Sequence, residues 1–510
     1  MGYSKTNQVK ETDVIIIGAG IIGMSLAREL TKYQVDVTVI EKEADVSMGI
    51  SKTSGSLIYM GLFQALSLVI KDLGRGADLI EETRTERMKM LWGGFSVFDD
   101  LAHDLDIAHK HVGLLLIARN ESELGRLRHL EELSKFVPGG TVRRVEREEL
   151  FEMEPNLTRD ALAGLYDSTG TISIFGPEYV FAVYENAREN GAKVMLNTAC
   201  QGVLEENGYQ IVSTDRGPIK ARFVINCAGK YSDRVADLAG ARTGWNLVFY
   251  RTQALVMDKK LDGFINNIVG LPPDADKIDF FYPLAEGNIH VYCGCYDLIE
   301  DRDFTETTRH DFDETIGRMK LIFPTLSEDD IITSYVGVRT FNDKIFDENL
   351  IEHSPRNPNF INALVRMPGF TPAPKIAEKV VGMLAERGLE LKKNNAFNPF
   401  RKGIPRFRFL TDEERSELIA KNPLYGRIIC RCETVTEGEI VEAIRRGART
   451  LQGVMFRTRA GMGRCQRNWC GPKIIEVIGR ELRLPEKEVT FKGTRCPIVF
   501  SQISGGGGLK

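Results

Sequence analysis

Residues 13–23 read Asp-Val-Ile-Ile-Ile-Gly-Ala-Gly-Ile-Ile-Gly, and the fold class of the N-terminal part follows from this segment. A short apolar run of β-branched residues that stops at a glycine is typical of a buried parallel strand. Helical spacing of apolar residues follows over Ile21 to Lys32, and a second apolar run extends from Val35 to Ile40. The order strand, helix, strand predicts a βαβ unit and therefore an α/β fold.

The three glycines of this segment lie at the predicted turn between strand and helix. Gly18 permits the tight turn, Gly20 lets the backbone approach a pyrophosphate, and Gly23 lets the helix pack on the sheet. The helix N-terminus presents N–H groups and a partial positive charge to that pyrophosphate. Glu41 ends the second predicted strand, where a carboxylate can accept hydrogen bonds from both hydroxyls of an adenosine ribose. We therefore predict a dinucleotide site, although the glycines alone do not identify the dinucleotide.

Length and charge limit the function classes. The chain has 510 residues and a formal net charge of −4, which indicates several soluble domains and gives no case for nucleic-acid binding. The apolar run from Val112 to Ala118 is too short to span a bilayer, and the N-terminus lacks the apolar region of an export signal. Nine cysteines without an export signal indicate a reducing compartment. We expect a cytoplasmic protein, or one held at a membrane by a partner.

Four of the nine cysteines fall close together near the C-terminus. Cys430-Arg431-Cys432 is followed by Cys465 and then by Cys470, and four thiolates are enough to ligate one iron–sulfur cluster. Structural zinc also accepts four cysteines, but zinc sites more often use Cys-x2-Cys pairs. The other cysteines are scattered, as is typical of small core residues.

Four further segments carry a resemblance to a known family. They read Val224-Ile-Asn-Cys-Ala-Gly229, Ser334-Tyr-Val-Gly-Val-Arg339, Pro368-Gly-Phe-Thr-Pro-Ala-Pro374 and, less specifically, the loop 51–61. The chain resembles the D-amino-acid-oxidase-like superfamily of flavoproteins. Within it, the chain is most similar to the group of anaerobic glycerol-3-phosphate dehydrogenase large subunits and L-2-hydroxyglutarate oxidases. The resemblance implies that the dinucleotide is FAD.

The same resemblance implies roles for individual residues. Ala228 and Gly229 would form the turn that returns to the FAD, and Gly369 and Thr371 would lie in the loop that faces the flavin. A helix beginning near Thr371 would direct its positive end at the flavin edge where negative charge accumulates on reduction. Arg339 would hold a substrate carboxylate or phosphate through two parallel hydrogen bonds.

Two departures from the family pattern affect the substrate. Tyr59 stands where relatives commonly carry a histidine, and the Gly-Gly-Lys signature of the glycerol-3-phosphate enzymes is missing near residue 367. Oxidation of an alcohol needs a base for the hydroxyl proton, and the ordinary pKa of histidine suits that task while that of tyrosine does not. Tyr59 is therefore either a catalytic residue or a packing residue, and oxidation of an amine remains open beside that of a hydroxy acid.

The C-terminal region carries a second resemblance. Around Cys430-Arg-Cys-Glu433 and the segment 457–466, the chain is similar to bacterioferritin-associated ferredoxin-like domains, which hold a [2Fe–2S] cluster. The resemblance identifies Cys430, Cys432, Cys465 and Cys470 as the ligands. Thr436 and Glu439 form a predicted capping box, and five arginines near the cysteines would ease reduction of a negatively charged cluster. These arginines are Arg431, Arg457, Arg459, Arg464 and Arg467.

We therefore expect a Rossmann-like FAD-binding domain with an inserted antiparallel-β substrate domain, followed by a small α-rich [2Fe–2S] domain. The expected boundaries are 1–90, 145–235 and 330–393 for the FAD-binding domain, 91–144 and 236–329 for the substrate domain, 394–409 for a linker, 410–503 for the cluster domain and 504–510 for a flexible tail.

The expected function is an FAD-dependent dehydrogenase that oxidises a small anionic substrate. Candidate substrates are glycerol 3-phosphate, a 2-hydroxy acid or an amino acid. Electrons would pass through the cluster to an electron-acceptor protein or a second flavoprotein subunit. Two alternatives stay open, namely a non-catalytic electron-transfer subunit that keeps the FAD fold, and an NAD-dependent enzyme with a zinc domain.

Overall fold

The structure is a computed structural model in which the chain forms two compact units. Unit 1 comprises Met1–Ile40 and Ser47–Arg401, and unit 2 comprises Glu41–Val46 and Lys402–Lys510. The structure describes residues 10–72, 86–137, 141–274, 277–295, 297–344, 349–493 and 496–498. The expected tail at 504–510 lies outside the described residues.

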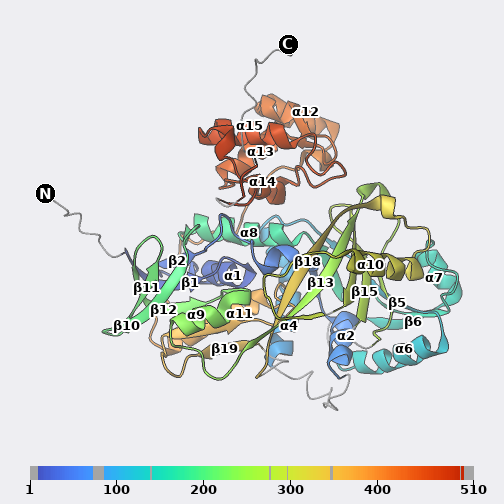
Figure 1. Ribbon diagram of the computed structural model, residues 1–510, viewed down its shortest axis with the longest axis horizontal. Helices are drawn as coiled ribbons and strands as arrows, with labels where there is room; N and C mark the ends of the chain where they lie inside the picture. The colour runs from blue at the N-terminus through green and yellow to red at the C-terminus, as the bar shows by residue number, and fades with distance from the viewer. Residues whose placement is uncertain are drawn as a thin grey trace, which may run out of the picture. The chain divides into compact units, whose positions relative to one another are not determined.

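The first sheet of unit 1 is built on the N-terminal segment (Figure 1). β1 (Lys10–Ile17) pairs in parallel with β2 (Val37–Ile40) on one side and with β12 (Ile219–Asn226) on the other. The register sets Ile17 opposite both Ile40 and Asn226, so the carboxyl ends of these strands meet at one edge. The other strands of this sheet are β9 (Lys193–Met195), β10 (Cys200–Glu206), β11 (Tyr209–Thr214), β19 (Leu350–His353) and β20 (Phe360–Leu364).

Helices cover this sheet, as the apolar strands require. Val14–Ile17 of β1 are all buried, which is expected for a parallel strand covered on both faces. α1 (Ile21–Leu30) packs against α8 (Gly176–Glu189) and α11 (Ala373–Glu386). The predicted βαβ unit is confirmed. The last of these helices begins two residues after Thr371, because Pro372 occupies its N-cap.

The second sheet of unit 1 is mainly antiparallel, as expected for residues 246–335. β13 (Leu247–Met257) pairs along its length with β18 (Ile331–Asn342), and with β16 (Ile289–Cys295) near its end. β15 (Lys277–Pro283) continues the sheet beside β16. The other strands are β5 (Leu114–Ala118), β6 (Val142–Glu146), β7 (Ala163–Asp167), β14 (Ile268–Gly270) and β17 (Asp297–Ile299).

The two sheets divide the chain differently from the expected domain segments. β7 lies within 145–235 and β18 within 330–393, both of which we expected in the FAD-binding domain, yet both strands pair in the second sheet. β14 pairs with β5 in parallel, although both were expected in an antiparallel sheet. The expected linker 394–409 is divided at Arg401. This residue makes a buried ion pair with Glu185 of unit 1 at 2.7 Å, whereas Lys402 onward belongs to unit 2.

The remaining elements of unit 1 complete its helical cover and add a small sheet. The small sheet joins β3 (Leu57–Tyr59), β8 (Thr171–Ile174) and β4 (His109–His111). The helices and short 3₁₀ turns are η1 (Ile50–Thr53), α2 (Gly61–Asp72), α4 (Glu86–Ser96), α5 (Phe98–Asp104), α6 (Glu121–Ser134), α7 (Arg147–Met153), η2 (Gly229–Tyr231), α9 (Ser232–Leu238), η3 (Lys259–Leu261), α10 (Arg309–Ile322) and η4 (Glu328–Asp330).

Unit 2 is a small α-rich bundle with its own apolar core. Ile440, Val454 and Ile478 come from three different helices and are fully buried together. Its elements are η5 (Phe407–Phe409), α12 (Asp412–Lys421), η6 (Pro423–Gly426), β21 (Ile428–Cys430), β22 (Val435–Thr436), α13 (Glu437–Arg445), α14 (Leu451–Thr458), α15 (Gly471–Leu482) and η7 (Glu486–Glu488).

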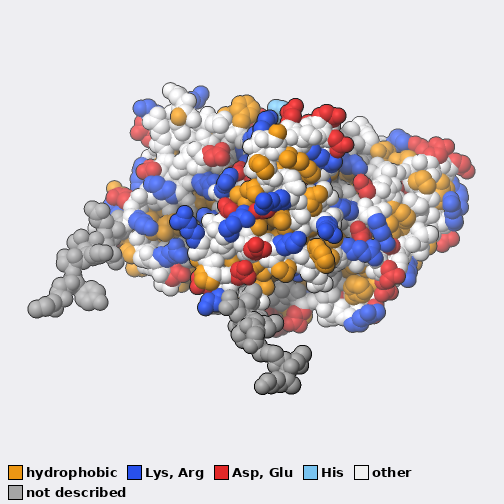
Figure 2. All heavy atoms as spheres, turned by 90° about the horizontal axis from the view of Figure 1, so that it is seen from above, with side chains coloured by type: hydrophobic (Ala, Val, Ile, Leu, Met, Phe, Trp, Pro, Cys, Tyr) orange, Lys and Arg blue, Asp and Glu red, His pale blue; other side chains and the backbone are white. Residues whose placement is uncertain are grey.

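Among the described residues, we find no helix with the length and apolar character needed to cross a membrane. On the face drawn in Figure 2, basic and acidic side chains are interspersed.

Candidate functional site

The predicted dinucleotide turn is closely packed and tolerates only glycine at two of its positions. Gly18 has φ 108°, and a Cβ there would lie 2.5 Å from the carbonyl oxygen of Cys227. A Cβ on Gly23 would lie 2.0 Å from the carbonyl oxygen of Gly18. Gly20 is the N-cap of α1 and supplies no side-chain cap, while the N–H of Ile21 donates to Ser51 Oγ at 3.1 Å. A helix start whose N-cap residue has no side chain, beside a glycine-rich turn, fits a pyrophosphate.

Two other predicted segments of unit 1 lie near this turn. The approach of Cys227 to Gly18 brings Ala228 and Gly229 to the carboxyl edge of the first sheet, and Gly229 has φ 56°. A Cβ on Gly369 would lie 3.8 Å from the Ile21 side chain at the start of α1. The structure therefore brings Gly18, Gly20, Gly23, Ala228, Gly229 and Gly369 to one end of α1.

Glu41 follows β2 directly in the chain but is grouped with unit 2. Its Oε1 accepts a hydrogen bond from the N–H of Glu43 at 2.9 Å, within the same short segment. Its role at the ribose stays a prediction.

Tyr59 lies at the end of β3 and is 7% exposed. Its N–H donates to Thr371 Oγ1 at 3.2 Å, so the structure brings these two predicted residues together. The Tyr59 ring packs against Phe63, with ring centroids 4.2 Å apart. Burial raises the pKa of Tyr59 to about 12, against the opposing effect of Arg87 and other nearby arginines. A hydroxyl with this pKa is protonated at neutral pH.

Arg339 lies on β18 and is 3% exposed. Its Nη2 donates to the carbonyl oxygen of Thr53 at 2.8 Å and to the hydroxyl of Tyr292 at 2.9 Å. A Cβ on Gly337 would lie 2.7 Å from Arg339 Nη1, so the glycine of the matching segment makes room for the guanidinium. The cation therefore lies between the second sheet and the loop 51–61 that the resemblance assigns to the flavin.

His290 is a buried neighbour of this cation; the sequence indicated only that His290 and His353 could approach the site, and assigned neither a role. It is 3% exposed, and its ring contacts the hydroxyl of Tyr282 through Nδ1 at 2.8 Å and that of Tyr335 through Nε2 at 2.6 Å. Burial, followed by the charge of Arg339, lowers the pKa of His290 to about 3. The only signal in the sequence was its place on an alternating strand. His353 lies apart from this group, on β19 of the first sheet, and its Nδ1 contacts the carbonyl oxygen of Pro358 at 2.8 Å.

The four clustered cysteines of unit 2 form two contacting pairs. Cys430 is hydrogen-bonded to Cys470, and Cys432 to Cys465. The bond from Cys470 lowers the pKa of Cys430 to about 6, and the N–H of Gly461 also donates to Cys430 Sγ at 3.4 Å. The thiols thus offer two pairs of sulfur ligands, the donor set that a [2Fe–2S] cluster requires.

The loops that carry the cysteines are shaped by left-handed residues. Thr434, Arg459, Gln466 and Arg467 have φ between 45° and 76°. A Cβ on Gly463 would lie 2.5 Å from the Cβ of Cys432, so this position requires glycine. The predicted capping box is present, since Glu439 N–H donates to Thr436 Oγ1 at 3.3 Å and Thr436 N–H donates to Glu439 Oε2 at 2.7 Å.

Two of the five arginines near the cysteines are paired with buried carboxylates. Arg457 makes two hydrogen bonds to Asp45, at 2.5 and 2.8 Å, and both side chains are at most 2% exposed. Arg459 donates to Glu433, which is fully buried, at 3.4 Å. The positive charge expected around the cysteines is therefore partly compensated.

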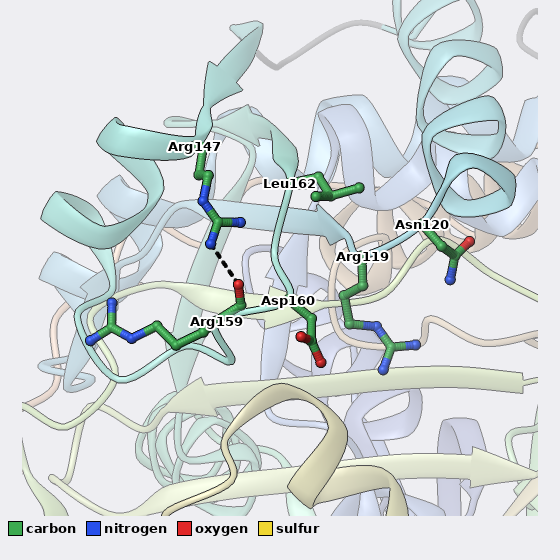
Figure 3. A pocket seen from close by; sticks show the side chains of 6 residues that line it. All are labelled: Arg119, Asn120, Arg147, Arg159, Asp160 and Leu162. Carbon is green, nitrogen blue, oxygen red and sulfur yellow. Dashed lines mark hydrogen bonds between the residues drawn. The ribbon is translucent and has the colours of Figure 1, made fainter.

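A cluster of possible metal ligands and a surface hollow lie elsewhere on unit 1. Asp99, His109 and His111 place one ligand atom each within 4.8 Å of one another and could hold a metal ion. A hollow of about 540 Å³ is bordered by charged and polar side chains, with Arg147 bonded to the Arg159 carbonyl at 2.6 Å (Figure 3). Its lining residues are Arg119, Asn120, Arg147, Arg159, Asp160 and Leu162, none of which is a predicted site residue.

Comparison with known protein families gives matches over both units. The family model described as FAD dependent oxidoreductase matches residues 13–383, and that described as BFD-like [2Fe-2S] binding domain matches residues 428–480. Among curated proteins, a glycerol 3-phosphate dehydrogenase of Caloramator mitchellensis is 34% identical over 485 residues, which is 94% of this chain and 96% of that protein.

Two solved structures share the fold. The L-alpha-glycerophosphate oxidase of Mycoplasma pneumoniae with FAD bound has a TM-score of 0.67 at 21% identity, and the match covers 77% of this chain and 99% of that chain. The glycerol-3-phosphate dehydrogenase of Bacillus halodurans complexed with FAD also has a TM-score of 0.67, at 16% identity, and covers 94% of this chain and 92% of its own.

Proposed function

Because this chain belongs to the family of FAD-dependent oxidoreductases and carries a BFD-like [2Fe–2S] domain, we propose that it oxidises the CH–OH group of glycerol 3-phosphate, or of a similar small anionic substrate, and passes the electrons through the cluster to a partner protein. FAD supplies the acceptor for the substrate hydride, and the [2Fe–2S] cluster carries single electrons. This proposal agrees with the fold and cofactors expected from the sequence.

The extent of the similarity to one dehydrogenase is the observation that carries the substrate class. The similarity extends over nearly the whole of both chains, so it includes the segments of both units of this chain. Arg339 supports an anionic substrate, because a buried guanidinium beside the loop 51–61 can bind a phosphate or carboxylate through charge-assisted hydrogen bonds. Tyr292 and the Thr53 carbonyl would fix its orientation.

A protein acceptor is favoured by the combination of cofactors. A flavin receives two electrons together, whereas the cluster passes one at a time. The cluster is therefore useful when the next carrier is a protein that accepts single electrons. In unit 2, the N–H of Gly461 donates to Cys430 Sγ at 3.4 Å, and the absence of a side chain at Gly463 leaves room for Cys432. We expect low activity with oxygen as the acceptor.

The test is anaerobic reduction of the bound flavin. sn-Glycerol 3-phosphate should bleach the flavin absorbance, while glycerol, which lacks the phosphate, should not. L-2-Hydroxyglutarate and L-proline serve as the hydroxy-acid and amine comparisons. Arg339→Lys should raise the concentration of glycerol 3-phosphate needed for half-maximal bleaching about tenfold or more, since the planar fork of arginine is lost.

The loss of the family histidine at position 59 favours one alternative, a non-catalytic electron-transfer subunit. That alternative expects no substrate to bleach the flavin, although dithionite still reduces both cofactors. Complete bleaching by one substrate, with electrons then appearing in the cluster signal, would exclude it. Failure of every substrate, alone and with candidate protein acceptors, would instead contradict the proposed enzyme.

A further inference from the structure

The buried group around His290 is assembled on one face of the second sheet. Opposite residues of paired strands point to the same face, and Tyr282 pairs with His290 while Phe280 pairs with Tyr292. On β18, Tyr335 and Arg339 share a face, because side chains alternate along a strand. Tyr335 contacts His290 and Arg339 contacts Tyr292, so all these side chains lie on the same face.

The hydrogen bonds of this group define the tautomer of His290. The Tyr282 hydroxyl donates to the carbonyl oxygen of Gly55 at 2.6 Å, and a carbonyl can only accept. Towards His290 Nδ1 the Tyr282 oxygen is therefore the acceptor, and Nδ1 carries the proton. In a neutral imidazole the other nitrogen, Nε2, then holds a lone pair, which accepts the hydroxyl proton of Tyr335.

Tyr335 is the least buried member of this group. It is only partly buried, whereas His290 behind it is 3% exposed. Its hydroxyl also lies 3.5 Å from the carbonyl oxygen of Ser54, in the loop that the resemblance places beside the flavin. The hydrogen bonds therefore connect Tyr335 to His290, His290 to Tyr282, and Tyr282 to the Gly55 carbonyl.

The proposed oxidation needs a group that takes the hydroxyl proton, and Tyr59 is poorly suited to it. Its pKa of about 12 leaves very little phenolate at neutral pH, and burial raises the pKa of Tyr335 as well, so a tyrosine here needs a partner that takes its own proton. The Nε2 of His290, by contrast, already accepts a short hydrogen bond from Tyr335.

We propose that Tyr335 and His290 form a proton relay that replaces the missing family histidine: Tyr335 takes the substrate hydroxyl proton and passes its own proton to His290 Nε2. The inference rests on the proposed function. As the substrate carbon gives its hydride to FAD, the O–H bond breaks, a C=O bond forms, and the released proton becomes the new Tyr335 hydroxyl proton. The proton that leaves Tyr335 converts His290 to an imidazolium, which returns it to solvent after the product leaves.

The charge of Arg339 makes this relay dependent on an anionic substrate. The charged and titratable groups that face His290 are Arg339, Tyr335 and Tyr282, and only Arg339 carries a charge at neutral pH. Burial, and after it that charge, opposes protonation of the imidazole. A phosphate or carboxylate bound to Arg339 compensates the charge and so makes protonation of His290 less unfavourable. The relay therefore links substrate charge to the rate of oxidation.

The first test is the rate of flavin reduction in the full-length holoprotein, measured by anaerobic stopped flow at saturating substrate. Tyr335→Phe and His290→Gln should each lower this rate about 100-fold. The apparent substrate dissociation constant should change less than threefold, because Arg339 is retained. Tyr166→Phe is the matched control, since Tyr166 lies on β7 of the same sheet, bonds Asn267 at 3.3 Å and is outside the site. It should leave the rate unchanged.

The pH profile separates a relay from a structural role. A neutral His290 gives a rate that is nearly flat from pH 6 to 9, whereas a base at Tyr59 gives a rate that rises about tenfold per pH unit. In His290→Gln the residual rate should rise with pH, because hydroxide then replaces the lost acceptor. Wild-type rates that rise tenfold per unit, or variants with wild-type rates, would overturn the relay.

The second test does not depend on turnover. In protein labelled with ¹⁵N-histidine, the ring signals come in pairs from only seven histidines, and His290→Gln identifies the pair that belongs to His290. That pair should show the Nδ1–H neutral tautomer from pH 5 to 8, and the Nε2–H tautomer would refute the relay even if no substrate were found. Failure of every substrate to reduce the wild-type flavin, with the expected tautomer present, would count against the proposed function instead.

Discussion

Gly337 shows how a single hydrogen atom in place of a side chain makes room for a charge. The glycine lies two positions before Arg339 on β18, and a Cβ there would meet Arg339 Nη1 at 2.7 Å and the Thr53 carbonyl at 2.8 Å. The guanidinium could not keep its present position beside such a side chain.

We therefore expect Gly337→Ala to raise the KM for the anionic substrate about tenfold while the protein still folds and binds FAD. Steady-state kinetics with an artificial one-electron acceptor would measure the change. Gly317→Ala, at a helical position where a Cβ meets nothing within 4 Å, is the control. Equal KM values in both variants would show that the position of Arg339 does not matter for binding.

Gly463 makes a similar demand in unit 2, because a Cβ there would lie 2.5 Å from the Cβ of Cys432. Gly463→Ala should displace Cys432 and lower the iron content from two atoms per chain towards zero, with the flavin content unchanged. Iron analysis and the cluster's visible absorbance would measure this. Gly426→Ala, whose Cβ would lie 3.4 Å from Ile419, should retain its iron. Retention of iron by both variants would contradict the argument.

At the residue scale, the sequence predicts the site residues that belong to a local motif and few others. Gly18 and Gly23 follow from the spacing of one turn, and the four cysteines follow from their clustering. The group around His290 could not be predicted, because Tyr282, His290 and Tyr335 come from three strands whose register the sequence does not specify. The roles given to Arg339 and Tyr59 remain predictions.

The start of helix α13 follows from a capping box in the sequence, and the stability of this helix should depend on pH. Burial raises the pKa of Glu439, the second residue of its capping box, to about 7, against hydrogen bonds from Thr436 and Phe407 and the charge of Arg408. The folded pKa exceeds the ordinary value of 4.5 for glutamate, so the folded state binds the proton more tightly than the unfolded state. This carboxyl therefore lowers stability as pH rises from about 4.5 to about 7.

Glu439→Gln should remove that pH dependence, since glutamine keeps the capping hydrogen bonds but does not titrate. Thermal unfolding of unit 2, followed through the cluster absorbance at pH 5, 6 and 7, should show a smaller fall of Tm in the variant than in the wild type. Glu413→Gln, an exposed change in α12, serves as the control. Parallel Tm curves for Glu439→Gln and wild type would disprove the assignment.

The elements that the sequence missed are the short ones. The helix α1 and the strand β2 were predicted to within two residues of their ends, because each has a clear period or apolar run and α1 follows a glycine turn. β7 and β14 have five and three residues, too few to display a period of two. Their pairing with β5 depends on distant parts of the chain, which is why the expected domain boundaries differ from the sheets.

At the scale of the whole molecule, unit 2 depends on a segment far away in sequence. Asp45 lies 412 positions before Arg457, yet the two form a buried ion pair within unit 2. No local pattern predicts such a pair, because neither residue has a neighbour in sequence that signals the other. The general fold class, by contrast, follows from motifs at both ends of the chain and agrees with the matched families.

Asp45→Asn should destabilise unit 2 by about 3–5 kcal/mol, since it removes the buried negative charge that compensates Arg457. Urea unfolding of the holoprotein, followed through the cluster absorbance, would measure the loss. Glu417→Gln, which disrupts an exposed pair with Lys421 at 3.9 Å, should cost less than about 0.5 kcal/mol. A similar midpoint for Asp45→Asn and wild type would show that the buried pair contributes nothing.

The chain passes between the units three times, after Ile40, after Val46 and after Arg401. A gene fragment that starts at Lys402 would therefore encode a ferredoxin-like module without one of its own parts, the hexapeptide Glu-Lys-Glu-Ala-Asp-Val. If this module were joined to another flavoprotein, the recipient would have to supply an equivalent acidic segment after its second strand. Joining two genes end to end would not by itself supply that segment.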